Sequence, residues 1–447
     1  MLNPCPDAPT TGKFSPRRYW SAEEVVDAGL RNRQPRSDKE ATGQLDELLR
    51  SVIRQQMVAD VPLGAFLSGG IDSTLVVSCM QAESATPIRT FTIGYHEPGY
   101  NEAEFASAIS RHLGTEHHEL YVTPAQAMEV IPRLPTLYDE PFADSSQIPT
   151  FLVCQLARRH VTVSLSGDGG DELFAGYNRY LWSDTLGRRA QWVPASLRRA
   201  AAAGLRSLSP ASWDALHDQI RRWAPRLGKS IPPNLGGKLH KLADGLGAGS
   251  AMEIYRGLIS GWGGLSLVRG IDHDGQQQFG AVLNGRPQGW PFIDQAMYFD
   301  LMQYLPDDNL VKVDRASMSL GLETRVPLLD PRIMGFASQL PMNMKVRGGK
   351  SKWILRKALE RYVPRELTER PKMGFSVPIG QWLAGPLRDW AEDLLAMPRL
   401  EADGFLDAQR VAACWREHVA GQRNWAQPLW TVLMFQAWHR QVAQTAG

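Results

Sequence analysis

The residues best suited to chemistry form one short glycine-containing loop. Two adjacent glycines let the backbone approach a ligand closely, and a helix starting there points amide N–H groups and the positive end of its dipole at an anion. Three hydroxyl groups add donors, and the Asp72 carboxylate suits Mg²⁺. Gly70 stands where a Walker A loop has its lysine. We therefore predict a phosphate or pyrophosphate site of another kind, with a plain strand–turn–helix as the alternative. The residues of the loop are Leu67, Ser68, Gly69, Gly70, Ile71, Asp72, Ser73 and Thr74.

A second loop, residues 166–172, carries three glycines and three carboxylates. Neighbouring carboxylates repel one another and a triphosphate unless a cation lies between them, and Mg²⁺ prefers hard oxygen ligands. We therefore expect Asp72 and Asp171, one from each loop, to hold Mg²⁺. Turn and capping roles for the aspartates are the alternative.

Both loops follow predicted strands, which must position them. Short apolar or β-branched runs indicate strands over 61–66, 88–94, 116–122 and 161–165. Helical patterns over 44–57, 101–113, 125–131 and 147–159 separate or precede them. Strands alternating with helices predict an α/β fold, with a parallel sheet covered by helices on both faces. Ligands of such sheets bind at the carboxyl ends of the strands, where both glycine loops fall.

The rest of the chain is predicted to be mostly helical. Residues 1–40 are expected to be an arm or linker remnant, 41–180 the core, 181–290 a helical region whose role the sequence does not reveal, and 291–447 a helical C-terminal part. Helices are predicted over 195–208, 213–223, 252–261, 294–304, 310–320, 352–362, 386–395 and a Trp-rich tail, 408–442.

Composition narrows the class of protein. The 447 residues include 49 basic and 47 acidic side chains, and this balance indicates neither a nucleic-acid partner nor a membrane surface. No signal pattern and no apolar run near 18 residues is present. The four cysteines are widely separated and lack metal-ligand spacing. We expect a cytoplasmic protein in a reducing compartment.

Taken together, several segments closely resemble the synthetase domain of the glutamine-hydrolysing (class B) asparagine synthetases. The resemblance covers about residues 40–180 and 290–440 and is loose between them. It implies the adenine nucleotide alpha hydrolase-like ATP pyrophosphatase fold, with 41–180 as its core and 291–447 completing the domain. The segments that carry it are 67–74, 138–146, 166–177, 304–315, 321–330, 349–352 and 372–378.

The resemblance implies an AMP-forming amide ligase. Such enzymes adenylate the side-chain carboxylate of aspartate with MgATP, release pyrophosphate, and let ammonia displace AMP. Residues 67–74 would bind the ATP phosphates, Ile93 would lie near adenine, and Ser166 and Gly167 would contact the nucleotide. Asp168 would lie beside the β-aspartyl-AMP intermediate.

Lys372 matches the lysine that stabilises charge on the departing pyrophosphate, a strong electrostatic role for a fixed cation. Lys350 and Lys352 could reach phosphate, although a solvated loop is an equal reading. A last group is expected to border the amino-acid pocket, with surface salt bridges as an almost equally good reading: Asp314, Arg315, Glu323 and Arg325.

Family members begin with a glutaminase domain whose catalytic cysteine is the N-terminal residue, because its α-amino group serves as the base. Here Cys5 follows four residues. We expect this chain alone not to hydrolyse glutamine, and to take free ammonia or ammonia from a separate glutaminase subunit, or else to be a truncated product. Two alternatives stay open: a β-lactam synthetase or peptide cyclase type of enzyme with another carboxylate substrate, and an inactive scaffold subunit.

Overall fold

The protein is described from a computed structural model. The described residues are 18–33, 35–95, 101–190, 192–208, 212, 213, 215, 216, 219, 235–260, 262, 266–270, 289–369 and 377–446.

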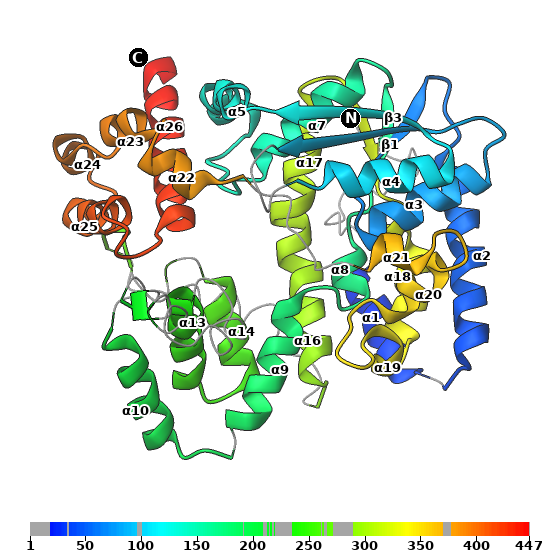
Figure 1. The fold of residues 1–447 in the computed structure, drawn as a ribbon, viewed down its shortest axis with the longest axis horizontal. Helices are drawn as coiled ribbons and strands as arrows, with labels where there is room; N and C mark the ends of the chain where they lie inside the picture. Colours follow the sequence, from blue (N-terminus) through cyan, green and yellow to red (C-terminus); the bar gives the residue numbers. More distant parts are fainter. Residues whose placement is uncertain are drawn as a thin grey trace, which may run out of the picture.

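The described residues form a parallel sheet with the strand order β3-β2-β1-β4-β5. Figure 1 shows β1 and β3 of this sheet beside α3, α4 and α7. The strands are β1 (Leu63–Phe66), β2 (Arg89–Tyr95), β3 (Glu116–Val122), β4 (Val163–Leu165) and β5 (Glu323–Arg325). The first four confirm the predicted strands and the α/β fold class. The fifth was not predicted, because its three residues Glu-Thr-Arg carry no apolar pattern. It pairs with β4 in parallel, with Val163 opposite Glu323 and Leu165 opposite Arg325.

Helices cover both faces of the sheet, as expected for a parallel sheet that buries both sides. On one face α3 (Ile71–Ala82) and α4 (Ala103–Leu113) share a core with Ala65 and Leu165. On the other face α7 (Gln147–Arg158) and α17 (Val311–Met318) pack against each other, and their core includes Phe91 and Ile93. The carboxyl edge of the sheet is left between these layers, where the two glycine loops lie.

The remaining described helices surround this core. They are α1 (Ala22–Arg31), α2 (Asp38–Gln56), α5 (Pro124–Val130), α6 (Leu134–Leu137), α8 (Gly170–Leu173), α9 (Asn178–Ala190), α10 (Ala195–Arg206), α13 (Leu235–Gly247), α14 (Ala251–Ile259), α16 (Phe292–Phe299), α18 (Pro331–Gln339), α19 (Met342–Lys345), α20 (Trp353–Leu359), α21 (Arg365–Thr368), α22 (Ile379–Ala384), α23 (Arg388–Leu394), α24 (Met397–Asp403), α25 (Ala408–Val419) and α26 (Ala426–Ala446), with the 3-10 turns η1 (Ile131–Arg133) and η3 (Pro327–Leu329) and the π-helix η2 (Asp300–Leu310).

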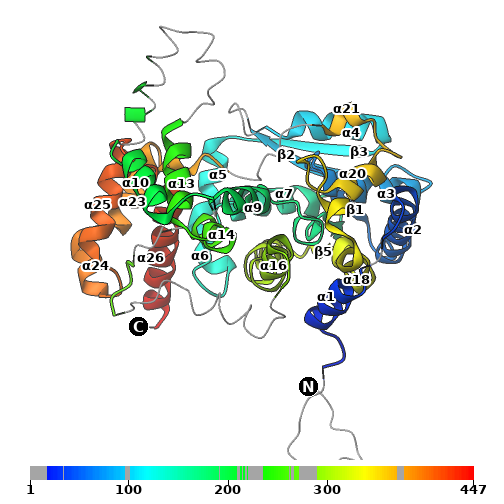
Figure 2. The ribbon, with the colours of Figure 1, turned by 90° about the horizontal axis from the view of Figure 1, so that it is seen from below.

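Two helical groups flank the sheet. The helices α9, α10, α13 and α14 lie together, with α9 and α14 both in contact with α16 (Figure 2). The predicted helix over 213–223 falls largely outside the described residues.

The C-terminal helices α22 to α26 pack on the core of α7, burying Trp425 and Trp430. The tail is two helices rather than one, because the chain turns at Gly421, whose φ of 67° suits glycine.

The N-terminal part corrects one expectation. The range 1–40 was predicted to be an arm, but it contains α1 and the start of α2. The Ser21 side chain caps α1 by accepting from the Glu24 amide at 3.4 Å. Gly29 is buried against Ser338 of α18, so close that a side chain would not fit. Arg33 then donates to Asp294 at 2.9 Å, which ties this segment to α16.

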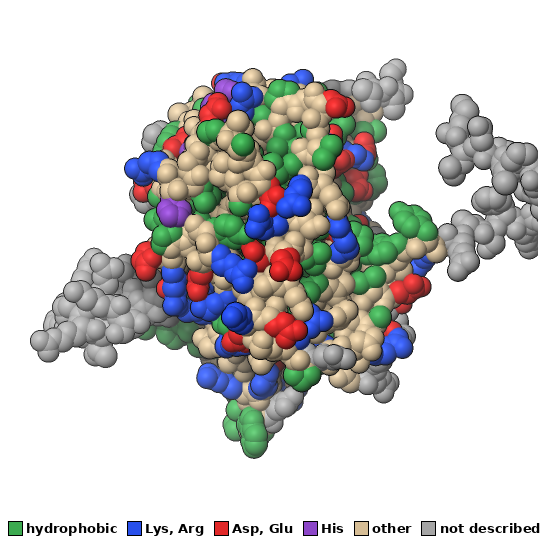
Figure 3. All heavy atoms as spheres, turned by 90° about the vertical axis from the view of Figure 1, so that its right-hand side faces the viewer, with side chains coloured by type: hydrophobic (Ala, Val, Ile, Leu, Met, Phe, Trp, Pro, Cys, Tyr) green, Lys and Arg blue, Asp and Glu red, His purple; other side chains and the backbone are tan. Residues whose placement is uncertain are grey.

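The charged surface is mixed in sign. On the face that carries α2, basic and acidic side chains lie next to one another (Figure 3). Arg50 and Arg54 both bind Glu83 at 2.6 Å there, and Arg361 binds Asp46 at 2.9 Å. Among the described helices, none combines the length and apolar character that a membrane span requires.

Candidate active site

A cavity of about 740 Å³ opens at the carboxyl edge of the sheet, between the two glycine loops. Its volume is that of a site for a small molecule of nucleotide size. Its walls come from both loops, from β2, α7 and η2, and from the segment before α20. The lining includes Ser68, Gly69, Gly70, Asp72, Ser73, Ile93, Glu102, Asp144, Ser146, Ser166, Gly167, Asp168, Asp171, Glu172, Tyr177, Tyr304, Asn309, Lys312, Lys350, Lys352 and Arg356.

The first loop is built to present its backbone. Gly69 has a φ of 72°, and Gly70 precedes the first turn of α3. The hydroxyl oxygens of Ser68 and Ser73 lie 3.0 Å apart, and the Gly70 amide donates to Ser68 Oγ at 3.3 Å. All eight residues predicted to bind phosphate line the cavity except Thr74, whose side chain is fully buried. The loop therefore aims a helix N-terminus at the cavity.

The second loop reaches the first because its glycines lack side chains. A Cβ on Gly167 would lie 2.6 Å from the backbone nitrogen of Ser73, and one on Gly170 would lie 2.6 Å from the Asp72 carboxyl carbon. Gly169 has a φ of 85° at the turn into α8. These contacts bring Asp72 and Asp171, the two residues predicted to hold a metal, close to one another.

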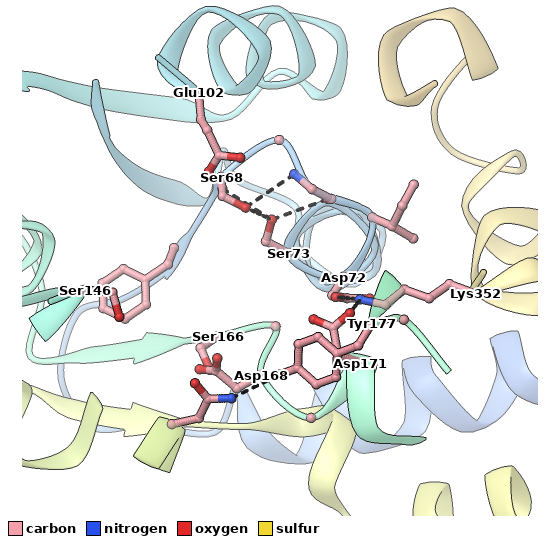
Figure 4. Close-up of a pocket in the computed structure, with 18 of the residues that line it drawn as sticks. Ser68, Asp72, Ser73, Glu102, Ser146, Ser166, Asp168, Asp171, Tyr177 and Lys352 are labelled. Atoms are coloured by element: carbon pink, nitrogen blue, oxygen red, sulfur yellow. Dashed lines mark hydrogen bonds and ion pairs between the residues drawn. The ribbon is translucent and has the colours of Figure 1, made fainter. Parts of the chain in front are cut away.

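Lys352 lies between the two carboxylates (Figure 4). Its ammonium contacts Asp72 and is 2.7 Å from Asp171, and the two carboxylates raise the pKa of Lys352 despite its burial. The residue adopts a left-handed backbone with a φ of 55°, directly before α20. Of the two readings that the sequence left open for this lysine, the structure supports the cavity and not the solvated loop.

The two carboxylates fit the donor set of a magnesium site. They converge on one cation, and Mg²⁺ is commonly held by one or two carboxylates together with substrate phosphates. The part of the chain that the structure describes contains no group of three His, Cys, Asp or Glu side chains placed for a metal. The remaining ligands would therefore have to come from phosphate and water.

Asp168 faces the same cavity from the second loop. Ser166 Oγ donates to Asp168 Oδ2 at 2.8 Å. Burial raises the pKa of Asp168, while this hydrogen bond and the positive charge of Lys312 oppose the shift. The carboxyl group is thus positioned to touch a ligand in the cavity.

A further polar cluster, for which the sequence predicted no role, lies on the cavity wall. Lys312 Nζ donates to Asp144 Oδ2 at 2.7 Å and to Asn309 Oδ1 at 3.2 Å. The amide and hydroxyl of Ser146 donate to Asp144 at 2.9 and 2.6 Å. Burial and the Asp144 charge raise the pKa of Asp308 to about 6. Lys312 follows two acidic residues in Pro-Asp-Asp-Asn-Leu-Val-Lys, which was the available signal.

The four residues predicted for the amino-acid pocket do not line this cavity. Arg315 binds Asp139 and Asp314 at 2.6 and 2.8 Å on the surface. Glu323 lies at the amino end of β5, opposite the edge that holds the loops. Arg325 binds Glu323 at 2.6 Å and donates to the carbonyl of Gln56. These four residues therefore form ion pairs with each other and with Asp139, which agrees with the salt-bridge reading that the sequence left open.

The other predicted site residues either line the cavity or lie outside the described residues. Ile93, Ser166 and Gly167 line the cavity together with the first loop. Lys372, predicted to be catalytic, lies outside the described residues.

An α/β sheet with a glycine loop and a facing acidic loop at its carboxyl edge defines a class of ligand-binding protein in which this edge is the functional site. Within that class, the chain belongs to the asparagine synthase family, whose model matches residues 44–440. That match includes the middle region, over which the sequence resemblance was loose.

Curated relatives agree with the family. The chain is 33% identical over 410 residues to a putative asparagine synthetase [glutamine-hydrolyzing] of Mycobacterium bovis, covering 90% of this chain and 58% of the relative. It is 30% identical over 396 residues to asparagine synthetase [glutamine-hydrolyzing] 1 of Bacillus subtilis, covering 87% and 57%. A more distant relative, amidase chry2 of Gibberella zeae, is 24% identical over 402 residues, or 84% and 58%. The chain thus spans less than two thirds of the length of these relatives.

Proposed function

We propose that this chain is an AMP-forming amide ligase that converts aspartate and ammonia into asparagine at the expense of MgATP. The observation that carries the proposal is the meeting of Asp72, Asp171 and Lys352 beside the glycine loop, in a cavity that also holds Asp168. A triphosphate needs donors and cations, and this arrangement supplies both. Membership of the asparagine synthase family supports the choice of reaction.

In the proposed reaction an oxygen of the aspartate side chain attacks the α-phosphorus of ATP. The bond between the α- and β-phosphates breaks, pyrophosphate leaves, and a β-aspartyl adenylate forms. Ammonia then attacks the acyl carbon, AMP leaves, and the new amide loses a proton. Both steps move negative charge onto phosphate, so fixed cations and amide donors aimed at the phosphates lower the barriers.

The residues take separate roles in this proposal. The loop 67–73 would hold the phosphates with its amides and hydroxyls, while Ile93, Ser166 and Gly167 would contact the nucleotide. Asp168 would lie against the acyl adenylate, and Lys372 would stabilise charge on the departing pyrophosphate. Asp72 and Asp171 would hold Mg²⁺, which when bound would neutralise phosphate charge.

The amino-acid end needs a carboxylate for an ammonium group and a cation for a carboxylate. Because the four residues predicted for that task lie outside the cavity, we assign it to Asp144 and Lys312, which line the cavity and form a largely buried ion pair. The nitrogen donor is proposed to be ammonia, either free or from a separate glutaminase subunit. The described cysteines Cys79, Cys154 and Cys414 are free and buried, which fits the proposed cytoplasmic location.

One assay tests the proposal. The purified chain is incubated with MgATP, aspartate and either ammonium or glutamine, and AMP, pyrophosphate and asparagine are measured. Asparagine from ammonium and none from glutamine is the expected result. Absence of aspartate-dependent AMP would overturn the substrate assignment, and turnover with glutamine would overturn the proposed nitrogen source.

Lys372→Ala sharpens the test, since it should reduce pyrophosphate release at least about a hundredfold if the lysine stabilises the transition state. Turnover near that of the unsubstituted chain would remove Lys372 from the machinery. The second candidate is an amide-forming enzyme with another carboxylate substrate, which the more distant, amidase-named relatives leave open. AMP release that ignores aspartate but responds to other carboxylic acids would support that candidate.

A further inference from the structure

One buried ionic cluster lies behind the cavity wall and takes no part in the proposed chemistry. Asp300, the first residue of η2, is 1% exposed. Its carboxylate accepts from Arg179 at 2.7 Å, from Tyr255 at 2.5 Å and from the hydroxyl of Tyr180. A buried carboxylate with three donors is fully satisfied, and removing one partner would leave a buried charge uncompensated. The cluster is therefore a rigid joint between α9, α14 and η2.

Arg179 links this buried cluster to the cavity wall. The guanidinium carbon of Arg179 lies 3.9 Å from the ring centroid of Tyr177 and 4.8 Å from that of Tyr304. The two rings meet edge to face, with centroids 5.9 Å apart. A flat guanidinium stacks on aromatic faces in a way that an ammonium cannot. Arg179 thus fixes two rings at once, while Asp300 fixes Arg179.

Both rings line the cavity. Tyr177 lies beside Asp171 and Lys352 (Figure 4), and its hydroxyl donates to Glu172 at 2.8 Å. Tyr304 is carried by the π-helix η2, a type of helix that often occurs at functional sites. Asn309 of the same segment donates to the Tyr177 hydroxyl at 3.2 Å. A shift of Arg179 would therefore move the wall next to the carboxylate pair.

We propose that Arg179, held by Asp300, is a positioning residue that sets Tyr177 and Tyr304 against the ligand in the cavity. The inference rests on the proposed function of the cavity and goes beyond it. It also gives the helical region 181–290 a task, because α14 of that region supplies Tyr255 to the cluster around Asp300. Figure 2 shows α9 and α14 beside α16, which leads directly into η2.

The central experiment separates stacking from charge. Arg179→Lys keeps a cation opposite Asp300 but removes the flat group over the two rings. We expect the melting temperature to stay within a few degrees, while kcat/KM for MgATP falls about tenfold to a hundredfold, the range for a small misplacement of reacting groups. Arg188→Lys is the matched control, because Arg188 lies on the same helix and forms an exposed pair with Asp184. Arg179→Lys activity within twofold of that control would overturn the inference.

A double-mutant cycle shows whether Arg179 acts through the tyrosine wall. If Arg179 works by placing Tyr304, then Arg179→Lys should cost little further activity in a Tyr304→Leu background. If the activity loss of the double variant equals the product of the losses of the two single variants, the inference is contradicted. Should Arg179→Lys fail to fold, Tyr255→Phe removes one donor to Asp300 and keeps the ring. It should lower kcat/KM by about threefold to tenfold, and unchanged activity would overturn the inference.

The affinity for a non-hydrolysable analogue, α,β-methylene ATP, gives a readout that needs no turnover. We expect Arg179→Lys to weaken analogue binding about tenfold while Arg188→Lys leaves it unchanged. Equal affinities in the two variants would contradict positioning. An unsubstituted chain that binds the analogue but forms no aspartate-dependent AMP refutes the proposed function, whereas the comparison of the two variants judges the positioning role alone.

Discussion

The ammonium group of Lys352 lies 2.7 Å from the carboxylate of Asp171, inside the cavity that the two glycine loops enclose. It also contacts Asp72, so one cation holds together two carboxylates that would otherwise repel each other. Asp72 and Asp171 are also the two residues proposed to hold Mg²⁺. Whether Asp72 and Asp171 can bind Mg²⁺ can therefore be tested by stability measurements, without a catalytic assay.

Lys352→Met should destabilise the protein by about 1–3 kcal/mol, because two partly buried carboxylates, 16% and 20% exposed, lose their shared cation. Millimolar Mg²⁺ should then restore part of the melting temperature in the variant, since the carboxylates can take the metal in place of the ammonium. Lys350→Met is the control, because Lys350 pairs with Glu369 at the surface. Thermal melts with and without Mg²⁺ measure the effect, and a variant that Mg²⁺ does not stabilise would contradict the proposed metal pair.

Gly167→Ala should abolish nucleotide binding, because the new methyl group would lie 2.6 Å from the backbone nitrogen of Ser73 and force the loops apart. Gly204→Ala is the matched control. Gly204 lies in α10, where an added Cβ would meet no atom of another segment within 4 Å, and alanine there should stabilise by about 0.5–1 kcal/mol. Calorimetric titration with α,β-methylene ATP compares the two. Unchanged affinity in Gly167→Ala would show that the close approach of the loops is dispensable.

Glu172 should contribute a loss of stability as the pH rises from about 4.5 to about 7. Burial and the Asp171 charge raise the pKa of Glu172 from 4.5 to about 7, so over this range the unfolded chain releases a proton that the folded chain retains. The loss amounts to roughly 3 kcal/mol, absent below pH 4.5 and complete above pH 7. Urea denaturation across this range should give a flatter profile for Glu172→Gln.

Glu83→Gln is the control for that pH profile, because the contribution of Glu83 to stability rises with pH where that of Glu172 falls. Arg54 and Arg50 lower the pKa of Glu83, so its replacement should remove stability at neutral pH and not at acid pH. A Glu172→Gln profile that retains the original slope would mean that Glu172 does not carry the pH dependence.

Arg33→Met should lower the free energy of unfolding by about 1–3 kcal/mol, because the buried Asp294 loses its hydrogen-bonded ion pair and keeps only the more distant charge of Lys345. Arg31→Met, two residues earlier, removes an exposed pair with Asp27 and should change stability by less than about 1 kcal/mol. Urea denaturation measures both. Equal small effects would show that the N-terminal helix is not tied to the core through Arg33.

The sequence alone determined the sheet and the first loop, because their signals are local. The buried strand run before Leu67 and the Gly69-Gly70 pair after it occupy adjacent positions, so strand, turn and helix follow from neighbouring residues. The same holds for the β-branched strand before Ser166. By contrast, β5 is an edge strand whose residues Glu323–Arg325 show no strand pattern, and only its pairing with β4 makes it one.

The tertiary structure decided which charges meet. The sequence left Lys352 open between a phosphate contact and a solvated loop, and the fold brings it to Asp72. Lys312 carried no predicted role, and α17 sets it against Asp144. The direction of β5 places Glu323 at the edge away from the loops, which no spacing in the sequence could reveal. Such pairings depend on long-range closure of the chain, since the energy of two charges is set by their distance and burial and not by their separation in sequence.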